Sequence, residues 1–253
     1  VGESLMTKAL IERDVMVSIK QDGHHLKSAH KKNPIDWYVY TSALPLENPD
    51  HPELKYCEQH GIRTTKRADF INYLLNDKKL KMLAVSGTHG KSTTTAMLVW
   101  IFKQLKIPIS YSVGAKLSFG DMGEFDPKSK FFVYEADEFD RNFLEFSPAI
   151  SLITGVDYDH PDIYPSRSSY YEAFREFVSQ SSMTLLWKED AEKLNLSSSS
   201  TVVVLHKADY DNIATDLVGR VNREDARLVC QSVVSIDESQ DITKLSELLN
   251  RFP

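Results

Sequence analysis

Two glycines between an apolar run and a helical segment constrain this chain more than any other feature. Residues 82–85 are apolar and predict a buried strand, and residues 91–105 carry the apolar side chains of a buried helix. Between them stands Gly-Thr-His-Gly-Lys-Ser, residues 87–92. Glycines let backbone N–H groups approach phosphate oxygens, and a helix N-terminus carries partial positive charge. The stretch therefore predicts a phosphate-binding loop between a strand and a helix.

The residue types within this loop indicate how it would hold a nucleotide. We expect Lys91 to reach the terminal phosphates and the Ser92 hydroxyl to bind Mg²⁺. In the free protein we expect the Lys91 side chain to be solvated. The candidate ATP-binding residues of the loop are Gly87, Thr88, His89, Gly90, Lys91, Ser92 and Thr93.

The loop matches a shortened form of the usual phosphate-loop pattern, because Val85 stands where the first glycine belongs. The alternative is a plain glycine turn that exposes a lysine. We favour the phosphate loop because the flanking strand and helix are those that the motif requires.

Composition limits the kinds of partner. The chain of 253 residues carries 30 Lys and Arg against 36 Asp and Glu, so it lacks the basic balance of a nucleic-acid-binding protein. Cys57 and Cys230 belong to no C-x-x-C pair, which is typical of a reducing compartment. No apolar run reaches the roughly 18 residues of a membrane span, and the N-terminus lacks a signal-peptide pattern. We expect a cytoplasmic protein with a small ligand and with no nucleic-acid or membrane partner.

Alternating helices and strands predict an α/β domain over residues 1–77. We predict helices over 3–13, 53–60 and 68–75, strands over 15–19, 35–41 and 62–65, and a turn over 21–25. Three prolines predict a loop over 42–52, because proline lacks the donor of a strand ladder. The charged run DKKLK, which begins at residue 77, predicts a linker.

Residues 78–253 predict a central P-loop domain with a mostly parallel sheet. The fold class is therefore α/β, with a partial Rossmann-like domain in front. We predict further strands over 109–113, 131–135, 150–154, 184–187 and 201–205, and helices over 91–105, 169–178, 219–234 and 242–252. Residues 114–130 are expected to form an irregular connection, and residues 195–200 a polar turn.

Carboxylates follow two of the predicted strands. Glu135-Ala136-Asp137-Glu138 comes directly after the apolar run 131–135, and Asp157, Asp159 and His160 follow residues 150–154. Ligands of doubly wound sheets bind beyond the carboxyl ends of the strands, so these groups are expected beside the phosphate loop. Mg²⁺ prefers oxygen ligands and bridges phosphates. We therefore favour a magnesium site that includes Glu135 over a solvated acidic turn.

His160 is ambiguous from the residues alone. Mg²⁺ prefers oxygen, so a histidine at this place is more often a hydrogen-bonding loop residue than a metal ligand.

The motifs together resemble the Mur ligase family, the ATP-dependent enzymes that add amino acids to the peptidoglycan precursor. The resemblance covers nearly the whole chain and is strongest between residues 80 and 180, where it rests on GTHGKSTTT, EADEFDRNFL and SLITGVDYDHPDIYP. The segments TSALPLENPDHPEL and GIRTTKRADF resemble the end of the family's uridine-nucleotide domain. The resemblance therefore implies a partial UDP-substrate-binding domain over 1–77 and a central ATP-binding domain over 78–253.

Within the family, the motifs are most similar to the members that join L-alanine to UDP-N-acetylmuramate. The resemblance implies that the muramyl carboxylate attacks the γ-phosphate of ATP and that the alanine amine displaces phosphate from the resulting acyl phosphate. It assigns Lys91 to the transferring phosphoryl group, Ser92 and Glu135 to one Mg²⁺, and His160 to a second metal ion. The catalytic candidates are therefore Lys91, Glu135 and His160, and the metal candidates are Ser92, Glu135 and His160.

The sequence departs from the family at several places. The family pattern H-N-x-x-N appears as VNRED, residues 221–225, so only Asn222 carries over as an adenine contact. Between residues 206 and 219 the chain has room for fewer strands than the family. The family's diphosphate-binding loop and its C-terminal amino-acid-binding domain are absent from the sequence, so we expect this chain alone not to complete ligation.

Three other functions stay open. A recycling ligase that attaches a whole peptide to UDP-N-acetylmuramate shares the GTHGK loop, although the continuation Arg141-Asn142-Phe143-Leu144 favours the alanine enzyme. A nucleotide-binding switch or phosphotransferase is a different class, in which the paired acidic segments are not expected. A non-catalytic nucleotide-binding fragment is the last alternative.

Overall fold

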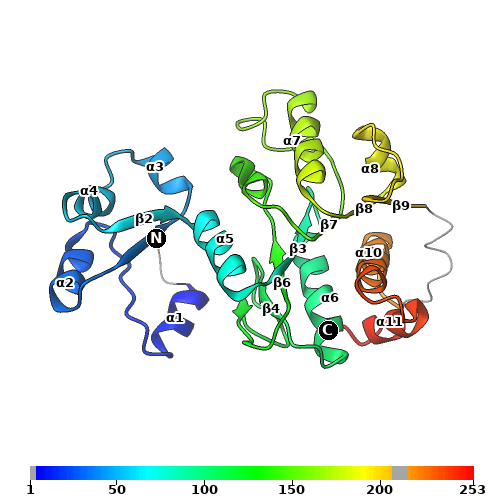
Figure 1. Ribbon diagram of the computed structural model, residues 1–253, viewed down its shortest axis with the longest axis horizontal. Helices are drawn as coiled ribbons and strands as arrows, with labels where there is room; N and C mark the ends of the chain where they lie inside the picture. The colour runs from blue at the N-terminus through cyan, green and yellow to red at the C-terminus, as the bar shows by residue number, and fades with distance from the viewer. Residues whose placement is uncertain (1–3, 207–215) are drawn as a thin grey trace. The chain divides into compact units, whose positions relative to one another are not determined.

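A computed structural model describes residues 4–206 and 216–253, and they form two compact units (Figure 1). Within the described residues, the first unit ends at Tyr73 and the second begins at Leu74. The division falls inside helix α5 (Arg67–Lys78) rather than at the predicted linker. Asp77 and Lys78 of the charged run end that helix, residues 79 and 80 follow, and Lys81 begins the next strand.

The first unit is built on two parallel strands joined by a helix. Strands β1 (Trp37–Tyr40) and β2 (Arg63–Lys66) pair in register from Trp37 with Arg63, and helix α4 (Pro52–Gln59) connects them. Tyr56, Cys57 and Ile62 form its small buried core. This β-α-β arrangement confirms the α/β prediction for the unit.

Three predictions in the first unit are wrong in whole or in part. Residues 15–19 form no strand. The predicted turn extends only to Gly23, because helix α2 (His24–Lys32) begins where Asp22 Oδ1 accepts from the His24 N–H at 3.0 Å. Helix α1 (Leu5–Ile11) is present as expected. Helix α3 (Ala43–Glu47) lies inside the predicted proline loop. Pro45 is tolerated there because it stands in the first turn, where N–H groups have no partner within the helix.

One sheet organises the second unit. Seven strands pair in the described residues, in the order β5-β4-β6-β3-β7-β8-β9, and only β5 runs antiparallel to its neighbour. The strands are β3 (Lys81–Ser86), β4 (Ser110–Ser112), β5 (Gly123–Glu124), β6 (Phe131–Glu135), β7 (Ile150–Ile153), β8 (Thr184–Trp187) and β9 (Val202–Leu205). The mostly parallel sheet confirms the predicted fold class.

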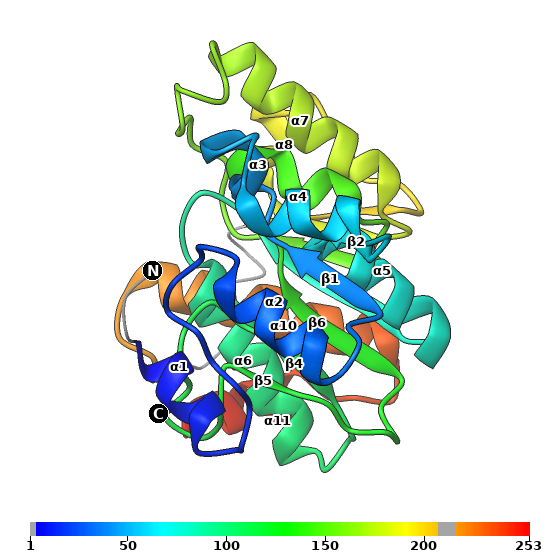
Figure 2. The same ribbon diagram turned by 90° about the vertical axis from the view of Figure 1, so that its left-hand side faces the viewer.

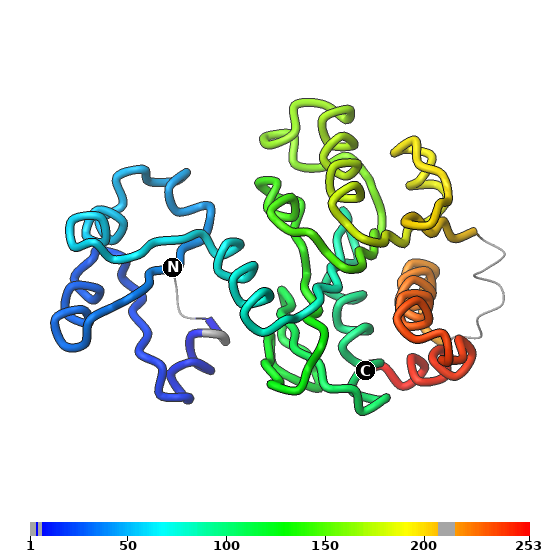
Figure 3. The backbone as a smooth tube through the Cα atoms, in the orientation of Figure 1, coloured from blue at the N-terminus to red at the C-terminus, as the bar shows by residue number. Residues whose placement is uncertain are grey.

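Helices cover both faces of this sheet. Helices α6 (Lys91–Gln104), α10 (Arg220–Ile236) and α11 (Ile242–Leu249) contact one another on one face, and α7 (Arg167–Gln180) lies on the other (Figures 1 and 2). The path of the backbone from β3 to β9 can be followed in Figure 3. Apolar strands such as β8, buried at every residue, are typical of a sheet covered on both sides.

Several short elements were not predicted. Strand β5 lies within the segment expected to be irregular, and helix α8 (Lys188–Lys193) follows β8 directly. The 3₁₀ segment η1 (Phe139–Glu145) contains Asp140 and Arg141 at φ of 53° and 57°. The prediction about strands between residues 206 and 219 falls largely on 207–215, outside the described residues. No helix in the described residues is long and apolar enough to span a membrane.

The register of the three central strands sets the position of the site. Val85 of β3 pairs with Glu135 of β6, and Ser86 pairs with Ile153 of β7, so the three strands end at the same level. After β3 the chain crosses to β4 on one side of it, and β7 lies on its other side. The loop after β3 therefore lies at the topological switch point of the sheet, where doubly wound proteins bind ligands.

Candidate functional site at the phosphate loop

The glycine loop has the backbone geometry of an anion site. Gly87 and Gly90 have φ of 140° and 82°, which side-chain-bearing residues rarely adopt. Gly90 is the N-cap of α6, and no side chain caps the helix. The first N–H groups of this 14-residue helix are therefore available to phosphate oxygens, as the sequence predicts.

Thr154, at the end of β7, holds the loop from the side. Its hydroxyl donates to the Ser86 carbonyl at 3.3 Å and contacts the His89 carbonyl. A Cβ on Gly87 would lie 2.4 Å from Thr154 Oγ1 and 2.9 Å from the backbone N and O of Gly155. Gly87 is therefore needed for close packing of the loop against β7. Sequence reasoning missed Thr154, because nothing local marks a threonine as a loop contact.

The hydroxyl and the backbone N–H of Thr88 both form hydrogen bonds within the protein. Its hydroxyl donates to the Asp157 carbonyl at 2.7 Å, accepts from the Asp157 N–H at 2.8 Å and lies 2.9 Å from the Tyr170 hydroxyl. Its own N–H donates to the Gly155 carbonyl at 2.9 Å. Thr88 therefore anchors the loop to β7 and α7. Of the other loop residues, His89 is exposed and Thr93 is half-buried in the first turn of α6.

Lys91 is held by a buried carboxylate. Its Nζ donates to Glu138 Oε2 and to the Gly87 carbonyl, both at 2.8 Å, and lies 3.8 Å from Asp137 Oδ1. The expectation that Lys91 is solvated in the free protein is therefore wrong. The reason is Glu138, whose side chain is fully buried, so that its charge needs a partner.

Glu138 is the main residue that sequence reasoning left out of the site. Burial raises the pKa of Glu138, and the hydrogen bond and charge of Lys91 oppose this rise. Its second oxygen, Oε1, makes no hydrogen bond within the described residues. The available signal was its place in the acidic run after β6, but spacing alone does not tell which carboxylate of that run faces inward.

Ser92 and Glu135 lie together, as the predicted magnesium site requires. The Ser92 hydroxyl donates to Glu135 Oε1 at 2.9 Å, and the Gly114 N–H donates to Oε2 at 2.7 Å. No group of three or more His, Cys, Asp or Glu with metal-site geometry occurs in the described part of the chain. A hydroxyl beside one carboxylate still fits Mg²⁺, which keeps several waters and takes phosphate oxygens as ligands.

His160 lies on the other side of Glu138. Its Nε2 is 3.7 Å from Glu138 Oε1 and 3.9 Å from Asp159 Oδ2, and its ring meets Phe139 edge-on at 5.2 Å. Its backbone is left-handed, with φ of 54°. The structure thus brings His160 to the same carboxylate as Lys91.

The other acidic residue after β7 points elsewhere. Asp157 Oδ1 accepts from Lys193 Nζ at 2.9 Å, and Lys193 also donates to Asp190 at 3.0 Å. Burial lowers the pKa of Lys193, but these two bonds outweigh it and leave the pKa raised. Asp157 therefore forms an ion pair on the α8 side of the strand ends.

Asn222 lies in the first turn of α10, where it is exposed. Its Nδ2 donates to the Val218 carbonyl at 2.8 Å. One turn further along, Asp225 packs against the phosphate loop, because a Cβ on Gly90 would lie 2.7 Å from Asp225 Oδ2. The beginning of α10 therefore borders the loop, and the adenine contact proposed for Asn222 stays a prediction.

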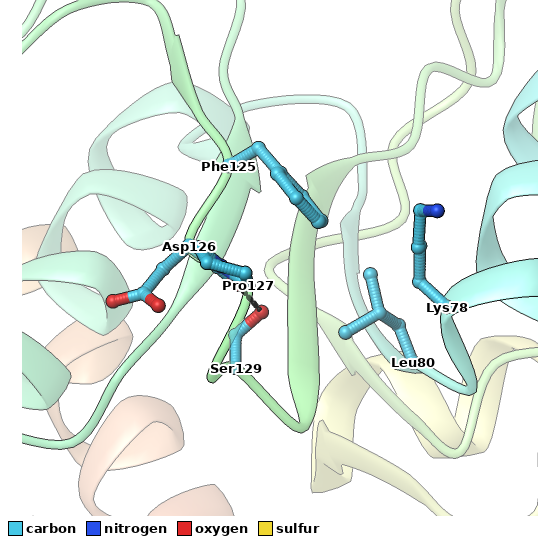
Figure 4. Close-up of a pocket in the computed structure, with 6 residues that line it drawn as sticks. All are labelled: Lys78, Leu80, Phe125, Asp126, Pro127 and Ser129. Atoms are coloured by element: carbon cyan, nitrogen blue, oxygen red, sulfur yellow. Dashed lines mark hydrogen bonds between the residues drawn. The ribbon is translucent and has the colours of Figure 1, made fainter.

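A surface cavity of about 170 Å³ lies away from these groups (Figure 4). It is lined by Lys78, Leu80, Phe125, Asp126, Pro127 and Ser129. These residues border the amino ends of β3 and β6, whereas the phosphate loop follows the carboxyl end of β3. We therefore place the site at the loop and not at this cavity.

Sequence comparison relates most of the second unit to one family. The profile of the Mur ligase middle domain matches residues 85–239. UDP-N-acetylmuramate–L-alanine ligase of Caldicellulosiruptor saccharolyticus is 34% identical over 176 residues, which are 70% of this chain and 36% of that protein. The enzyme of the same name from Porphyromonas gingivalis is 32% identical over 228 residues, covering 89% of this chain and 49% of that protein. The chain thus spans about a third to a half of these curated relatives.

Comparison with solved structures gives a similar result. UDP-N-acetylmuramate-alanine ligase from Thermotoga maritima superposes with a TM-score of 0.77 at 21% identity, covering all of this chain and 61% of that one. UDP-N-acetylmuramate:L-alanyl-gamma-D-glutamyl-meso-diaminopimelate ligase from Neisseria meningitides also gives 0.77, at 20% identity, covering all of this chain and 88% of that one. At these identities the superpositions establish the fold.

Proposed function

This chain belongs to the Mur ligase family, and from that membership we propose that it carries the ATP-binding part of a ligase joining L-alanine to UDP-N-acetylmuramate. In the proposed reaction the muramyl carboxylate attacks the γ-phosphorus of ATP, ADP leaves, and the alanine amine then displaces phosphate from the acyl phosphate. The observation that carries the proposal is the uncapped N-terminus of α6 at Gly90, beside the Ser92–Glu135 pair at 2.9 Å.

The residues at the strand ends have distinct proposed roles. The α6 N-terminus and Lys91 bind the β- and γ-phosphates, so Lys91 must exchange the Glu138 carboxylate for phosphate oxygens. Ser92 and Glu135 hold Mg²⁺, which neutralises charge on the phosphates when bound. His160 holds a second metal ion, and Asn222 contacts the adenine. The buried cysteines, both free, suit the reducing cytoplasm, where we place this reaction.

The amine substrate distinguishes this proposal from its nearest alternative. The relatives that share 31–38% identity with this chain are named as L-alanine ligases, which favours L-alanine. A ligase named for a tripeptide gives an equal TM-score, so a peptide-attaching enzyme is the second candidate.

Two measurements test the proposal. Isothermal titration of this chain should show Mg-ATP binding that is lost when Mg²⁺ is chelated. Phosphate release should be assayed in a preparation that contains the whole ligase, with UDP-N-acetylmuramate and either L-alanine or the tripeptide as the amine. Release that requires L-alanine supports the proposal, and release that requires the tripeptide supports the second candidate. Absence of Mg-ATP binding would overturn both.

Replacement of Glu135 by alanine should raise the Mg²⁺ concentration needed for ATP binding by at least about tenfold, since loss of metal-binding groups costs that much or more. The reason is that Glu135 is the carboxylate bonded to Ser92. Asp137→Ala is the matched control, because Asp137 is an exposed carboxylate of the same acidic run. Equal Mg²⁺ requirements in the two variants would remove Glu135 from the metal site.

A further inference from the structure

Asp225 is a buried carboxylic acid placed against the phosphate loop. It lies on α10 and is 1% exposed, and its Oδ2 would be 2.7 Å from a Cβ on Gly90. Neither Asp225 Oδ2 nor the neighbouring Thr94 Oγ1 makes a hydrogen bond of acceptable geometry within the described residues. A carboxylate at this place would put a negative charge, without a paired cation, beside a loop shaped to bind anions.

The neighbours of Asp225 do not compensate such a charge. On α6 the facing groups are Gly90 and the Thr94 hydroxyl, which favours the ionised form, while Glu224 on α10 adds a negative charge. Helix α11 and strands β7 and β8 also contact α10, and none of their described titratable groups acts on Asp225. Lys91 directs its amine to Glu138 instead.

Burial is the largest effect on the ionisation of Asp225. It raises the pKa of Asp225 to about 7, with Thr94 opposing the rise and Glu224 adding to it. The carboxyl therefore changes charge close to neutral pH, where an ordinary aspartate is fully ionised.

We propose that the phosphate loop holds a nucleoside triphosphate only when Asp225 carries a proton, so that a chain in which Asp225 is ionised takes up a proton at this side chain when it binds Mg-ATP. This inference rests on the proposed function, because it concerns the same nucleotide site. The physical cause is repulsion: the phosphates bring negative charge to a loop whose Gly90 is in contact with Asp225, in a region with little water to screen the two. A protonated carboxyl removes the repulsion, and asparagine would remove it permanently.

The test is calorimetric titration of the chain with Mg-ATP between pH 6 and pH 9, in buffers of different ionisation enthalpy. For the unmodified chain we expect the affinity to fall by roughly 50-fold between pH 7 and pH 9, since only the protonated fraction of a group with a pKa of about 7 binds. Between pH 7 and pH 9 the phosphates of ATP are already largely ionised, because the second pKa of a phosphate group is about 6. We also expect about half a proton to be taken up for each ATP bound at pH 7.

Two variants decide the source of that proton. Asp225→Asn should bind Mg-ATP with an affinity that is nearly constant from pH 7 to pH 9 and should take up no proton. Glu224→Gln, which removes the neighbouring charge but not the contact with Gly90, should keep the pH dependence. Circular dichroism at each pH confirms that the variants are folded.

Three results would overturn the inference. A folded Asp225→Asn chain that retains the pH dependence would place the proton elsewhere, and one that fails to bind Mg-ATP would show that a neutral side chain does not suffice. Binding by the unmodified chain that is independent of pH would show that the charge of Asp225 does not matter. Absence of binding at every pH, pH 6 included, would instead overturn the proposed function and this inference with it.

Discussion

Replacement of Lys91 by alanine is expected to weaken Mg-ATP binding by up to about 100-fold, because a hydrogen bond to a charged phosphate contributes up to about 3 kcal/mol. It is also expected to lower the free energy of unfolding by roughly 3 kcal/mol, because removing one partner of a buried ion pair leaves the other uncompensated. That partner is Glu138, which is fully buried and 2.8 Å from Lys91 Nζ. Calorimetric titration and urea unfolding at pH 8 measure the two losses.

The stability loss should depend on pH in a defined direction. Burial raises the pKa of Glu138, and Lys91 opposes the rise, so the pKa is higher still in the variant. Well below the ordinary pKa of 4.5 the carboxyl is neutral both in the folded and in the unfolded chain, and the loss of stability should be small. As the pH rises toward 8 the unfolded chain ionises freely, and the folded variant becomes less stable relative to it.

A second substitution separates the two effects of Lys91. In Lys91→Ala combined with Glu138→Gln, the buried charge is gone, so most of the stability at pH 8 should return while ATP binding stays weak. If the single variant unfolds at the same urea concentration as the unmodified chain, the ion pair does not stabilise the fold. If it binds ATP normally, the loop is not the phosphate site.

Replacement of Gly87 by alanine should destabilise the second unit by roughly 4 kcal/mol, as the sum of backbone strain and overpacking. Gly87 has φ of 140°, and its Cβ would lie 2.9 Å from the backbone N and O of Gly155, which cannot turn away as a flexible side chain can. Urea unfolding followed by circular dichroism measures the change.

Gly155→Ala is the matched control, because it lies in the same contact but faces open space. No heavy atom lies within 4 Å of a Cβ on Gly155, and its φ is outside the positive range. It should unfold at a urea concentration close to that of the unmodified chain. Equal destabilisation by the two substitutions would show that the close approach of loop and strand is not the cause.

Uninterrupted apolar runs made most of the fold predictable. Strands β6 and β8 begin and end at the predicted residues, because uninterrupted apolar runs are typical of strands in a parallel sheet that is covered on both faces. Residues 15–19 alternate like a strand and form none. The alternation of apolar and polar residues is a property of one segment, whereas a strand also needs a neighbouring strand with which to pair.

The site was predictable where a motif or the end of a strand fixes the place of a residue, and unpredictable where a contact depends on the direction of a side chain. The Ser92–Glu135 pair follows from two strands that end at the same level, which the doubly wound pattern implies. The bond from Thr88 to Tyr170 joins residues 82 positions apart, and the pair of Lys91 with Glu138 spans 47. Such contacts depend on which way each side chain turns after the strand ends, and single-sequence patterns do not carry that information.

In the free protein, carboxylates occupy Lys91 and Ser92, so only a ligand that can displace them binds in the loop. An incoming ligand must replace Glu138 at the lysine and must also compete with Glu135 at the serine hydroxyl. Orthophosphate alone would add negative charge beside Glu135 and Glu138, whereas a triphosphate arrives with a divalent cation that can take Glu135 as a ligand. Discrimination between an abundant small anion and the nucleotide therefore begins with the protein's own acidic side chains, before any part of the base or sugar is contacted.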